Sequence, residues 1–393
     1  MPTQVLVLGG GYAGVMAANR LTRRPDVAVT LVNPRPHFVE RIRLHQLAAG
    51  THPAAQELAH VLADAVRVEV GEADRIDAAA RTVALTDGAT LPYDYLVYAV
   101  GSRGSDGGVP GVAEHAFPIS TFEAATRLHA TLGRRGDVPV VVVGGGPTGI
   151  EAAAELAETG HAVTLVCGGH LGPYLRDPAR RSVARRLAEL GVTVLAGADV
   201  ARVEADAVVL ADGRRLPSGV TVWAAGFEAS DLARRSGLAV DDAGRLLTDE
   251  TLTSVDDPRV VGAGDAVSPS GVPEPMSCQA AIPLGMHAAD TVLHRLAGEP
   301  ARDLANPFVG MCVGLGRATA TFQLAHTNDV AVGAYLGGRT GGRLKELVCV
   351  QVVESLAREA RRPGSTWFPA SRARARSLAH PVTHDAAGAR VVA

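Results

Sequence analysis

The sequence has few cysteines and no long apolar run. Its 4 cysteines (Cys167, Cys278, Cys312 and Cys349) are far apart and form no C-x2-C or C-x4-C pair, which argues against a local redox disulfide or a zinc site. The first apolar run begins at Val5 and leaves no room for a signal peptide, and no run of about 18 apolar residues occurs. We therefore expect a cytoplasmic protein with reduced thiols, no metal and no membrane span.

Strong charge of one sign is also missing. The chain has 38 Lys and Arg against 41 Asp and Glu, a formal net charge of −3. No block of Lys and Arg with interleaved aromatic residues occurs, so we expect no nucleic-acid partner. The 393 residues are sufficient for two or three domains with large cores.

What the sequence does contain is a pair of glycine-rich turns, each placed after a short apolar run. The first spans residues 9–14 after Val5–Leu8, and the second spans 144–149 after Val140–Val143. An alanine-rich stretch with helical spacing follows each, so each predicts a strand, a G-x-G-x-x-G turn and a helix. This unit binds a diphosphate through backbone N–H groups at a helix N-terminus. Two such units indicate two dinucleotides.

Further elements follow from the same patterns. We expect a first helix over 15–21, a Pro- and Arg-rich loop over 33–44, and a helix over 178–190. Strands are expected at 28–32, 66–70, 82–85, 95–100, 162–166, 192–195, 208–210 and 220–224. A β-run ending in G-x-G-D occupies 257–265, before a helix over 278–297. A small antiparallel sheet (311–315, 318–323, 330–336), a helix over 342–361 and a loosely ordered tail after about Ala370 complete the chain.

Four motifs in this order resemble the flavoproteins with two dinucleotide-binding domains, the pyridine nucleotide-disulfide oxidoreductase-like family. They are Gly9–Gly14, Ala99–Gly101 after Tyr93–Tyr95, Gly144–Glu151 and Gly262–Asp265. Within the family, the chain is most similar to type II NADH dehydrogenases and related NAD(P)H:acceptor reductases. The resemblance implies an α/β fold with two Rossmann-like domains, the NAD(P) domain inserted in the FAD domain, and a small α+β C-terminal domain. The implied boundaries are 1–118 and 248–302 for FAD, 119–247 for NAD(P), 303–375 for a C-terminal interface domain and 376–393 for a flexible tail.

The resemblance also implies which residues bind the cofactors. Asn33 stands where an acid normally binds the adenosine ribose, and its amide can serve the same hydroxyls. Arg35 is either a contact to adenine or phosphate or a solvated loop arginine. Asp265 is expected to bind the ribityl chain of FAD. The full expected set for FAD is Gly9, Gly11, Tyr12, Ala13, Gly14, Asn33, Arg35, Arg41, Val70, Ala99, Gly101, Gly264, Asp265, Gln279 and Ala280, and that for NAD(P)H is Gly144, Gly146, Thr148, Gly149 and Gly226.

The end of the strand over 162–166 bears on the choice of nicotinamide cofactor. It has Cys167-Gly168-Gly169-His170 and no acid that would bind the 2′-hydroxyl of NADH, which favours NADPH. His170, Arg176, Arg180 and Arg181 are candidates for its 2′-phosphate, although each arginine also suits a solvated helix face. Glu151 occupies the family's G-x-E position near the nicotinamide–flavin contact, either as a catalytic residue or as an acid favoured by a helix N-terminus.

The expected acceptor site departs from the type II dehydrogenases. Their A-Q-x-x-x-Q stretch corresponds to residues 278–283, which keep Gln279 but have Pro283 in place of the second glutamine. Arg43 replaces an apolar residue and indicates a polar or anionic acceptor, a flavin contact, or a side chain that reaches solvent. Gln279 and Arg43, with Glu151, form the expected catalytic set. Cys278 lies next to the expected flavin, as a redox group or as a small buried residue.

The sequence therefore predicts an FAD-dependent NAD(P)H:acceptor oxidoreductase, in which hydride passes from nicotinamide C4 to flavin N5 and two electrons then pass to a quinone-like acceptor. Three alternatives stay open: a ferredoxin reductase-like carrier, a flavoenzyme of specialised-metabolite biosynthesis, and a redox-sensing protein similar to apoptosis-inducing factors. Peripheral membrane contact and a homodimer are also left open.

Overall fold

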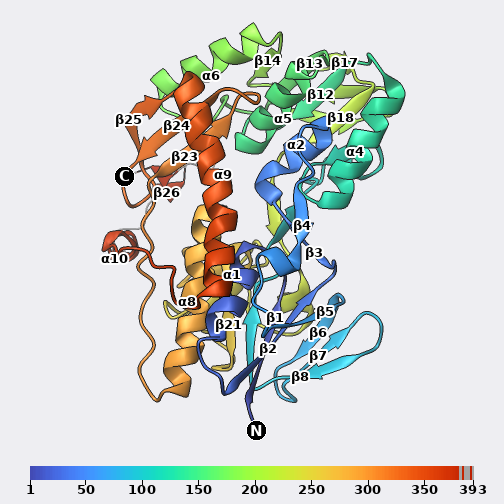
Figure 1. Cartoon of the computed structure of the whole chain (residues 1–393). Helices are drawn as coiled ribbons and strands as arrows, with labels where there is room; N and C mark the ends of the chain where they lie inside the picture. Colours follow the sequence, from blue (N-terminus) through green and yellow to red (C-terminus); the bar gives the residue numbers. More distant parts are fainter. Residues whose placement is uncertain (380–382, 385–389, 392–393) are drawn as a thin grey trace.

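The chain folds into two lobes joined along one side by a long helix (Figure 1). The computed structural model describes residues 1–379 and the segments Thr383–His384 and Arg390–Val391. The lower lobe contains the first of two five-stranded sheets, and the upper lobe contains the second. The joining helix, α9 (Gly338–Arg361), packs on α1 (Tyr12–Leu21) below and on β24 (Ala320–Ala325) above.

The first sheet is parallel. Its central strands are apolar and buried on both faces, whereas the edge strand Arg67–Val70 is mostly exposed. Its strand order is β21 (Val260–Gly262), β9 (Tyr95–Tyr98), β1 (Thr3–Leu8), β2 (Val27–Asn33) and β5 (Arg67–Val70). Such continuous apolar runs are typical of parallel strands covered by helices. Helix α1 crosses α8 (Cys278–Leu296) closely, because a Cβ on Gly285 would lie 2.2 Å from the Ala13 carbonyl oxygen.

The second sheet repeats this design in the upper lobe. Its strand order is β11 (Ala116–Pro118), β18 (Val220–Trp223), β12 (Val140–Val143), β13 (Val163–Cys167) and β14 (Thr193–Ala196), all parallel. Helices α5 (Pro147–Glu158) and α6 (Asp177–Glu189) connect its strands, and α4 (Phe122–Arg135) packs on β11. The chain then returns to the first sheet, where β21 pairs with β9.

The remaining strands form smaller sheets. An antiparallel sheet of β23 (Gly310–Gly314), β24 and β25 (Ala331–Leu336) precedes α9. The others are β6 (Ala73–Asp77) with β7 (Thr82–Leu85) and β8 (Thr90–Pro92), β15 (Val200–Val203) with β16 (Ala207–Leu210) and β17 (Arg215–Pro217), β10 (Ser102–Gly104) with β19 (Phe227–Ala229), β20 (Leu246–Thr248) with β22 (Val267–Pro269), β3 (His37–Val39) with β4 (Ala55–Glu57), and β26 (Thr383–His384) with β27 (Arg390–Val391). The short helices are α2 (Leu44–Ala49), α3 (Val112–His115), α7 (Leu232–Arg235) and α10 (Ala373–Ala379).

The predicted fold class is confirmed: two Rossmann-like units, the second inserted in the first, and an α+β C-terminal part. Several element predictions were wrong in detail. The region 33–44 is not a continuous loop, because it contains β3 and a 3-10 helix at Arg41–Arg43. Helix α9 begins at Gly338 rather than at 342, and α4, which Thr121 caps through the N–H of Ala124, was not predicted.

The prediction of a loosely ordered tail after Ala370 was wrong for residues 373–379, which form α10. Arg374, whose side chain is 3% exposed, anchors this helix through ion pairs with Glu250 (2.9 Å) and Glu274 (3.3 Å). The pattern of arginine and alanine resembles a solvated tail, but partners 100 and 124 residues away hold Arg374 and make this segment a partly buried helix. The rest of the tail predicted over 376–393 lies, apart from the two short segments named above, outside the described residues.

Candidate functional site

In the first glycine turn, two glycines have no space for a side chain and one has open space beside it. A Cβ on Gly9 would lie 2.4 Å from the Ala99 carbonyl oxygen, and a Cβ on Gly14 only 1.8 Å from that of Gly9. These two positions therefore admit no side chain. Gly11, by contrast, would place a Cβ in open space, with no atom within 4 Å. Gly11 is also the N-cap of α1 and brings no side chain to its N–H groups.

The second turn has the same geometry. A Cβ would lie 2.6 Å from the Ala224 carbonyl oxygen at Gly144 and 1.9 Å from that of Gly144 at Gly149, whereas at Gly146 it would meet nothing within 4 Å. Gly146 is the N-cap of α5. In both turns a bare helix N-terminus faces open space next to a glycine, which is the arrangement that a diphosphate requires. The residues present thus fit two dinucleotides.

The Asn33 side chain is hydrogen-bonded to the backbone of the first turn. Its Oδ1 accepts a hydrogen bond from the Gly10 N–H (2.9 Å), and its Nδ2 donates to the Arg35 carbonyl (2.6 Å). The Arg35 guanidinium donates to Glu123 of α4 (2.7 Å). Both side chains therefore stabilise the turn and its neighbouring loop, and of the roles foreseen for Arg35, the solvated loop arginine is closest to what the structure contains.

Asp265 lies in a small polar cluster that three distant segments form. Its carboxylate accepts a hydrogen bond from the Ser102 hydroxyl (2.8 Å), which in turn accepts one from Arg41 (3.1 Å). Arg41 also lies 3.7 Å from the Asp265 carboxylate. Burial raises the pKa of Asp265, and Arg41 and Ser102 offset this only in part. Gly101 (φ +70°) and Gly264 (φ +72°) turn the chain at the two ends of the cluster.

An acid that sequence reasoning missed lies at the end of β13. A Cβ on Gly168 would be 2.7 Å from the Asp199 carboxylate, so this carboxylate lies next to the position where an acid was expected and not found. Two of the three arginines proposed for a 2′-phosphate, Arg176 and Arg180, are bonded elsewhere. Arg176 donates to the Ala331 carbonyl (2.9 Å), and Arg180 to Leu171 and Leu175 carbonyls and to Asp177. Asp199 follows a different strand, so local spacing gives no signal for it.

Glu151 lies at the centre of a buried polar cluster between α5, α2 and α9. Its Oε1 lies 2.8 Å from the Lys345 ammonium and accepts a hydrogen bond from the Gly314 N–H (2.8 Å). Its Oε2 lies 3.7 Å from Nδ1 of His45. The exposed fractions of the three side chains are 9% for Glu151, 16% for Lys345 and 5% for His45. The sequence predicted Glu151 but gave no sign of Lys345, which lies 194 positions further on.

The protonation states in this cluster follow from burial and from the ion pair. Burial acts to raise the pKa of Glu151, but the Lys345 charge, His45 and the Gly314 N–H hold that pKa below its usual range. Burial disfavours the charged form of Lys345, yet the Glu151 carboxylate raises its pKa above the usual value. Burial lowers the pKa of His45 to about 4. At neutral pH the cluster thus holds a carboxylate, an ammonium and a neutral imidazole.

Arg43 neither reaches solvent nor presents a free guanidinium, so one of its three alternatives, the side chain that reaches solvent, was wrong. Its side chain is 3% exposed and pairs with Glu40 (3.1 Å) and with Glu346 of α9 (2.7 Å). It also donates to the Gln46 amide oxygen (3.0 Å). Arg43 thereby joins α2 to α9 directly beside the Glu151 cluster.

Gln279 and Pro283 lie in the first two turns of α8. The Gln279 amide, with its nitrogen toward Gly310, donates to the Gly310 carbonyl and accepts from the Val309 N–H, both at 3.2 Å. Pro283 has no N–H, so the Gln279 backbone carbonyl lacks its usual helical donor. Ser277 caps α8 by accepting from the Ala280 N–H (3.2 Å). The retained glutamine thus joins α8 to the start of β23.

The cysteines near α8 are protonated. Burial raises the pKa of Cys278 to about 11 and that of Cys312 to about 12. Cys349 interacts electrostatically with both, so the fold gathers three thiols that the sequence keeps apart. All cysteines in the chain are free. A buried, protonated thiol is a poor nucleophile at neutral pH.

The other expected cofactor residues are distributed over both turns. Tyr12, Ala13 and Ala99 are buried around the first turn, and Tyr12 packs edge-on against Phe38 with ring centroids 5.3 Å apart. Val70 ends β5 and is 51% exposed. Thr148 lies in the first turn of α5, and Gly226 (φ +96°) follows β18 and accepts from the Ser105 N–H (3.3 Å).

Comparisons with known proteins agree with this arrangement. A family model described as pyridine nucleotide-disulphide oxidoreductase matches residues 3–285. An NADH dehydrogenase-like protein of Mycobacterium tuberculosis is 33% identical over 357 residues, which cover 81% of this chain and 87% of that protein. The type II NADH:quinone oxidoreductase of Staphylococcus epidermidis is 28% identical over 396 residues, with 90% and 96% covered.

Solved structures show the same fold. The sulfide:quinone oxidoreductase of Aquifex aeolicus superposes with a TM-score of 0.78 at 21% identity, covering 92% of this chain and 93% of that one. NDH2 of Plasmodium falciparum gives a TM-score of 0.78 at 16% identity, covering 94% and 100%.

Proposed function

The chain belongs to the pyridine nucleotide-disulphide oxidoreductase family and is an NAD(P)H-dependent flavoprotein oxidoreductase; from this premise we propose that its flavin is FAD, its reductant NADH and its acceptor a quinone-like molecule. When bound, the flavin supplies the redox chemistry by taking hydride from the nicotinamide and passing two electrons on. The chain supplies binding, orientation and charge.

The observation that carries the proposal is the repeated geometry of the two glycine turns. Gly11 and Gly146 each leave open space at an uncapped helix N-terminus. The glycines that begin and end the turns are closed by backbone atoms: Gly9, Gly14, Gly144 and Gly149. A diphosphate in each turn binds first-turn N–H groups and gains from the helix dipole. Two turns of this kind support two dinucleotides, FAD at the first and the nicotinamide cofactor at the second.

The environment of β13 supports NADH, which reverses the preference for NADPH from the sequence. The Asp199 carboxylate beside Gly168 is placed to accept a hydrogen bond from a ribose 2′-hydroxyl and to repel a 2′-phosphate. Arg176 and Arg180 already donate to backbone carbonyls. The end of β13 has no acid of its own, and the segment after the adjacent strand β14 supplies one.

The Glu151 cluster supports a role in the handling of charge at the acceptor. The Glu151 carboxylate, which accepts a hydrogen bond from the Gly314 N–H, holds the Lys345 ammonium in one place. The Lys345 charge acts to lower the pKa of the three thiols near α8. An ammonium fixed in a buried site stabilises negative charge that develops on a nearby acceptor. We assign Lys345 this role and Glu151 the positioning of Lys345. Arg43, whose donors all bind protein groups, holds α2 against α9 and positions His45.

Two observations support a quinone-like acceptor in preference to the wider alternatives. Relatives that match over 85% or more of this chain are named type II NADH:quinone oxidoreductases, and Gln279 is retained at the start of α8. In the part of the chain that the structure describes, no helix is both long and apolar enough to cross a membrane.

The proposal is tested by anaerobic titration of the flavin-loaded protein with NADH and NADPH, followed by an acceptor screen. We expect NADH to bleach the flavin absorbance faster than NADPH, and a soluble quinone analogue to restore it. Faster bleaching by NADPH would overturn the cofactor assignment. The acceptor assignment would be overturned if no quinone reoxidised the flavin and an acceptor of another chemical class reoxidised it rapidly.

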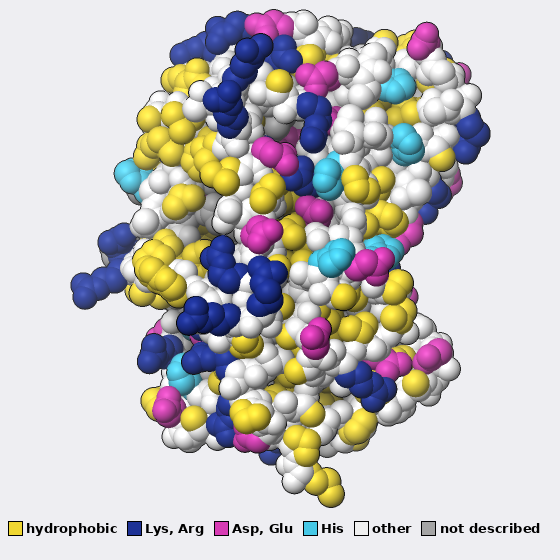
Figure 2. Space-filling view, in the orientation of Figure 1, with side chains coloured by type: hydrophobic (Ala, Val, Ile, Leu, Met, Phe, Trp, Pro, Cys, Tyr) yellow, Lys and Arg dark blue, Asp and Glu magenta, His cyan; other side chains and the backbone are white. Residues whose placement is uncertain are grey.

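A second candidate, an electron carrier that serves a small acidic redox protein, is supported by one observation. Lys and Arg side chains gather over the lower end of α9 and over α10 in Figure 2, and exposed arginines there include Arg358, Arg361, Arg362, Arg372 and Arg376. Transfer of electrons to ferredoxin at a rate that falls steeply with salt would favour this candidate.

A further inference from the structure

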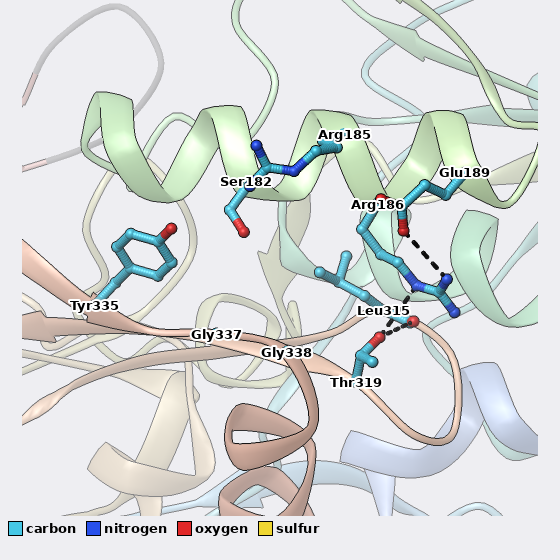
Figure 3. A pocket seen from close by; sticks show the side chains of 9 residues that line it. All are labelled: Ser182, Arg185, Arg186, Glu189, Leu315, Thr319, Tyr335, Gly337 and Gly338. Carbon is cyan, nitrogen blue, oxygen red and sulfur yellow. Dashed lines mark hydrogen bonds and ion pairs between the residues drawn. The ribbon is translucent and has the colours of Figure 1, made fainter.

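A cavity of about 620 Å³ lies where α6 faces the C-terminal sheet and the start of α9 (Figure 3). Ser182, Arg185 and Arg186 reach it from α6. Tyr335 of β25 and Thr319, which lies just before β24, face them. This volume is in the range of small-molecule sites. None of these residues belongs to either glycine turn or to the Glu151 cluster.

The cavity is separate from the second glycine turn. Arg186 at its edge lies 3.5 Å from Glu158, the last residue of α5, whereas Gly146 lies just before the first residue of that helix. A helix of this length spans about 18 Å at 1.5 Å per residue. A molecule in the cavity therefore does not overlap a diphosphate at Gly146.

The lining is suited to an anion. Arg186 is held in place by Glu158, Glu189 and the Thr319 hydroxyl, at 3.5, 3.5 and 3.2 Å. The Arg185 side chain forms no hydrogen bond or ion pair with any residue that the structure describes, so its guanidinium is available for a ligand. Arginine binds phosphate through paired N–H donors. Figure 2 shows further Lys and Arg side chains gathered over this upper end of the molecule.

Gly337 keeps the cavity open between its polar and aromatic walls. A Cβ there would lie 3.0 Å from the Tyr335 ring and 3.7 Å from the Ser182 hydroxyl, so a larger side chain would fill the gap. The Tyr335 ring points from the sheet toward α6 in Figure 3 and offers a flat face. Aromatic rings of this kind stack on nucleobases.

We propose that this cavity is a third binding site, which takes a nucleoside phosphate: its phosphate binds Arg185 and the Ser182 hydroxyl, and its base packs on Tyr335. A bound phosphate also lies near the first turn of α9, the helix that carries Lys345 two turns further on. The site goes beyond the proposed function, since its occupancy requires no electron transfer.

The test uses the flavin-loaded protein with ADP, inorganic phosphate and adenosine as probes. Calorimetry gives affinity, and hydrogen–deuterium exchange at residues 315–319 and 337–341 gives location, which separates this site from the glycine turns. Arg185→Glu and Gly337→Leu are compared with Arg127→Glu, an exposed arginine of α4 outside the cavity. Exchange is read with and without each probe.

We expect ADP to protect both segments in the wild-type protein and in Arg127→Glu. Arg185→Glu and Gly337→Leu should each weaken this binding about tenfold or more, the factor that 1.4 kcal/mol gives. Adenosine should bind least, and phosphate more weakly than ADP. The proposal is overturned if ADP protects neither segment of the wild-type protein, or if Arg185→Glu and Arg127→Glu bind ADP alike. Equal affinity for phosphate and ADP would overturn the nucleoside part.

Discussion

Replacement of Lys345 by methionine tests whether the buried ion pair with Glu151 is as important as its geometry indicates. The substitution keeps the length and the apolar stem but removes the ammonium 2.8 Å from the Glu151 carboxylate. Loss of one partner from a buried pair costs about 3–5 kcal/mol, because the other charge is left uncompensated. Glu151 keeps the Gly314 N–H (2.8 Å), so we expect the lower part of this range, about 3 kcal/mol at pH 7.

The pH dependence of this effect has a definite sign. In the variant, burial is no longer opposed by Lys345, so the pKa of Glu151 rises above its unfolded value. As the pH falls, the Glu151 carboxyl of the variant takes up a proton and the variant becomes more stable relative to the wild-type protein. The wild-type ion pair contributes stability above the pKa of Glu151 in the unfolded chain, and this contribution is lost as the pH falls through the lowered pKa of the folded protein. The difference between the two proteins should therefore shrink between pH 7 and pH 5.

Thermal or urea unfolding of the flavin-loaded proteins, followed by circular dichroism, measures this difference. The double variant Lys345→Met with Glu151→Gln is the control, because a neutral amide in the same place carries no buried charge and should recover most of the loss. A loss below about 0.5 kcal/mol for Lys345→Met at pH 7, the size of an ordinary surface change, would refute the reasoning.

Three further predictions follow from the same geometry. Gly11→Ala, whose Cβ meets open space, should fold normally but bind FAD roughly 5- to 150-fold more weakly, as expected for about 1–3 kcal/mol of overpacking against the diphosphate. Gly14→Ala should fail to fold stably, because its Cβ lies 1.8 Å from a carbonyl oxygen. Measurement of bound flavin and circular dichroism distinguish the two variants. Burial lowers the pKa of His45 to about 4 in the folded protein. As the pH falls, the imidazole therefore takes up a proton in the unfolded chain before it does so in the folded protein, and the free energy of unfolding falls between pH 6.5 and pH 4. His45→Gln should remove about 2 kcal/mol of that loss between pH 7 and pH 5 in urea unfolding, and an unchanged pH profile would contradict it. Asp199→Asn should raise the KM for NADH and narrow the preference for NADH over NADPH, with no change in flavin content. Kinetic constants for both cofactors that are unchanged from the wild-type protein would exclude Asp199 from the site.

The sequence was sufficient for the fold class because the strands and glycine turns are local patterns. The apolar runs before Gly9 and Gly144 are parallel strands, and their order with β21 follows from the order of the motifs. Errors arose where distant contacts decide the structure. Residues 373–379 have the composition of a solvated tail, but the ion pairs of Arg374 with Glu250 and Glu274 hold them as a partly buried helix.

The candidate site was predicted less completely, for the same physical reason. Glu151 follows from its spacing to the second turn, but its partner Lys345 comes from a helix near the end of the chain. Asp199 takes the place of an acid that the end of β13 lacks, and it reaches this place from the segment after β14. Arg43 was identified as unusual, yet its role depends on Glu346, which no local pattern connects with it.

The most direct test of the central claim, that two bare helix N-termini bind two dinucleotides, is the absorbance spectrum of the purified protein before and after addition of NADH without oxygen. We predict a yellow protein that releases FAD on denaturation, close to one per chain, and whose flavin absorbance is bleached by NADH. A colourless protein that FAD does not reconstitute would contradict the account.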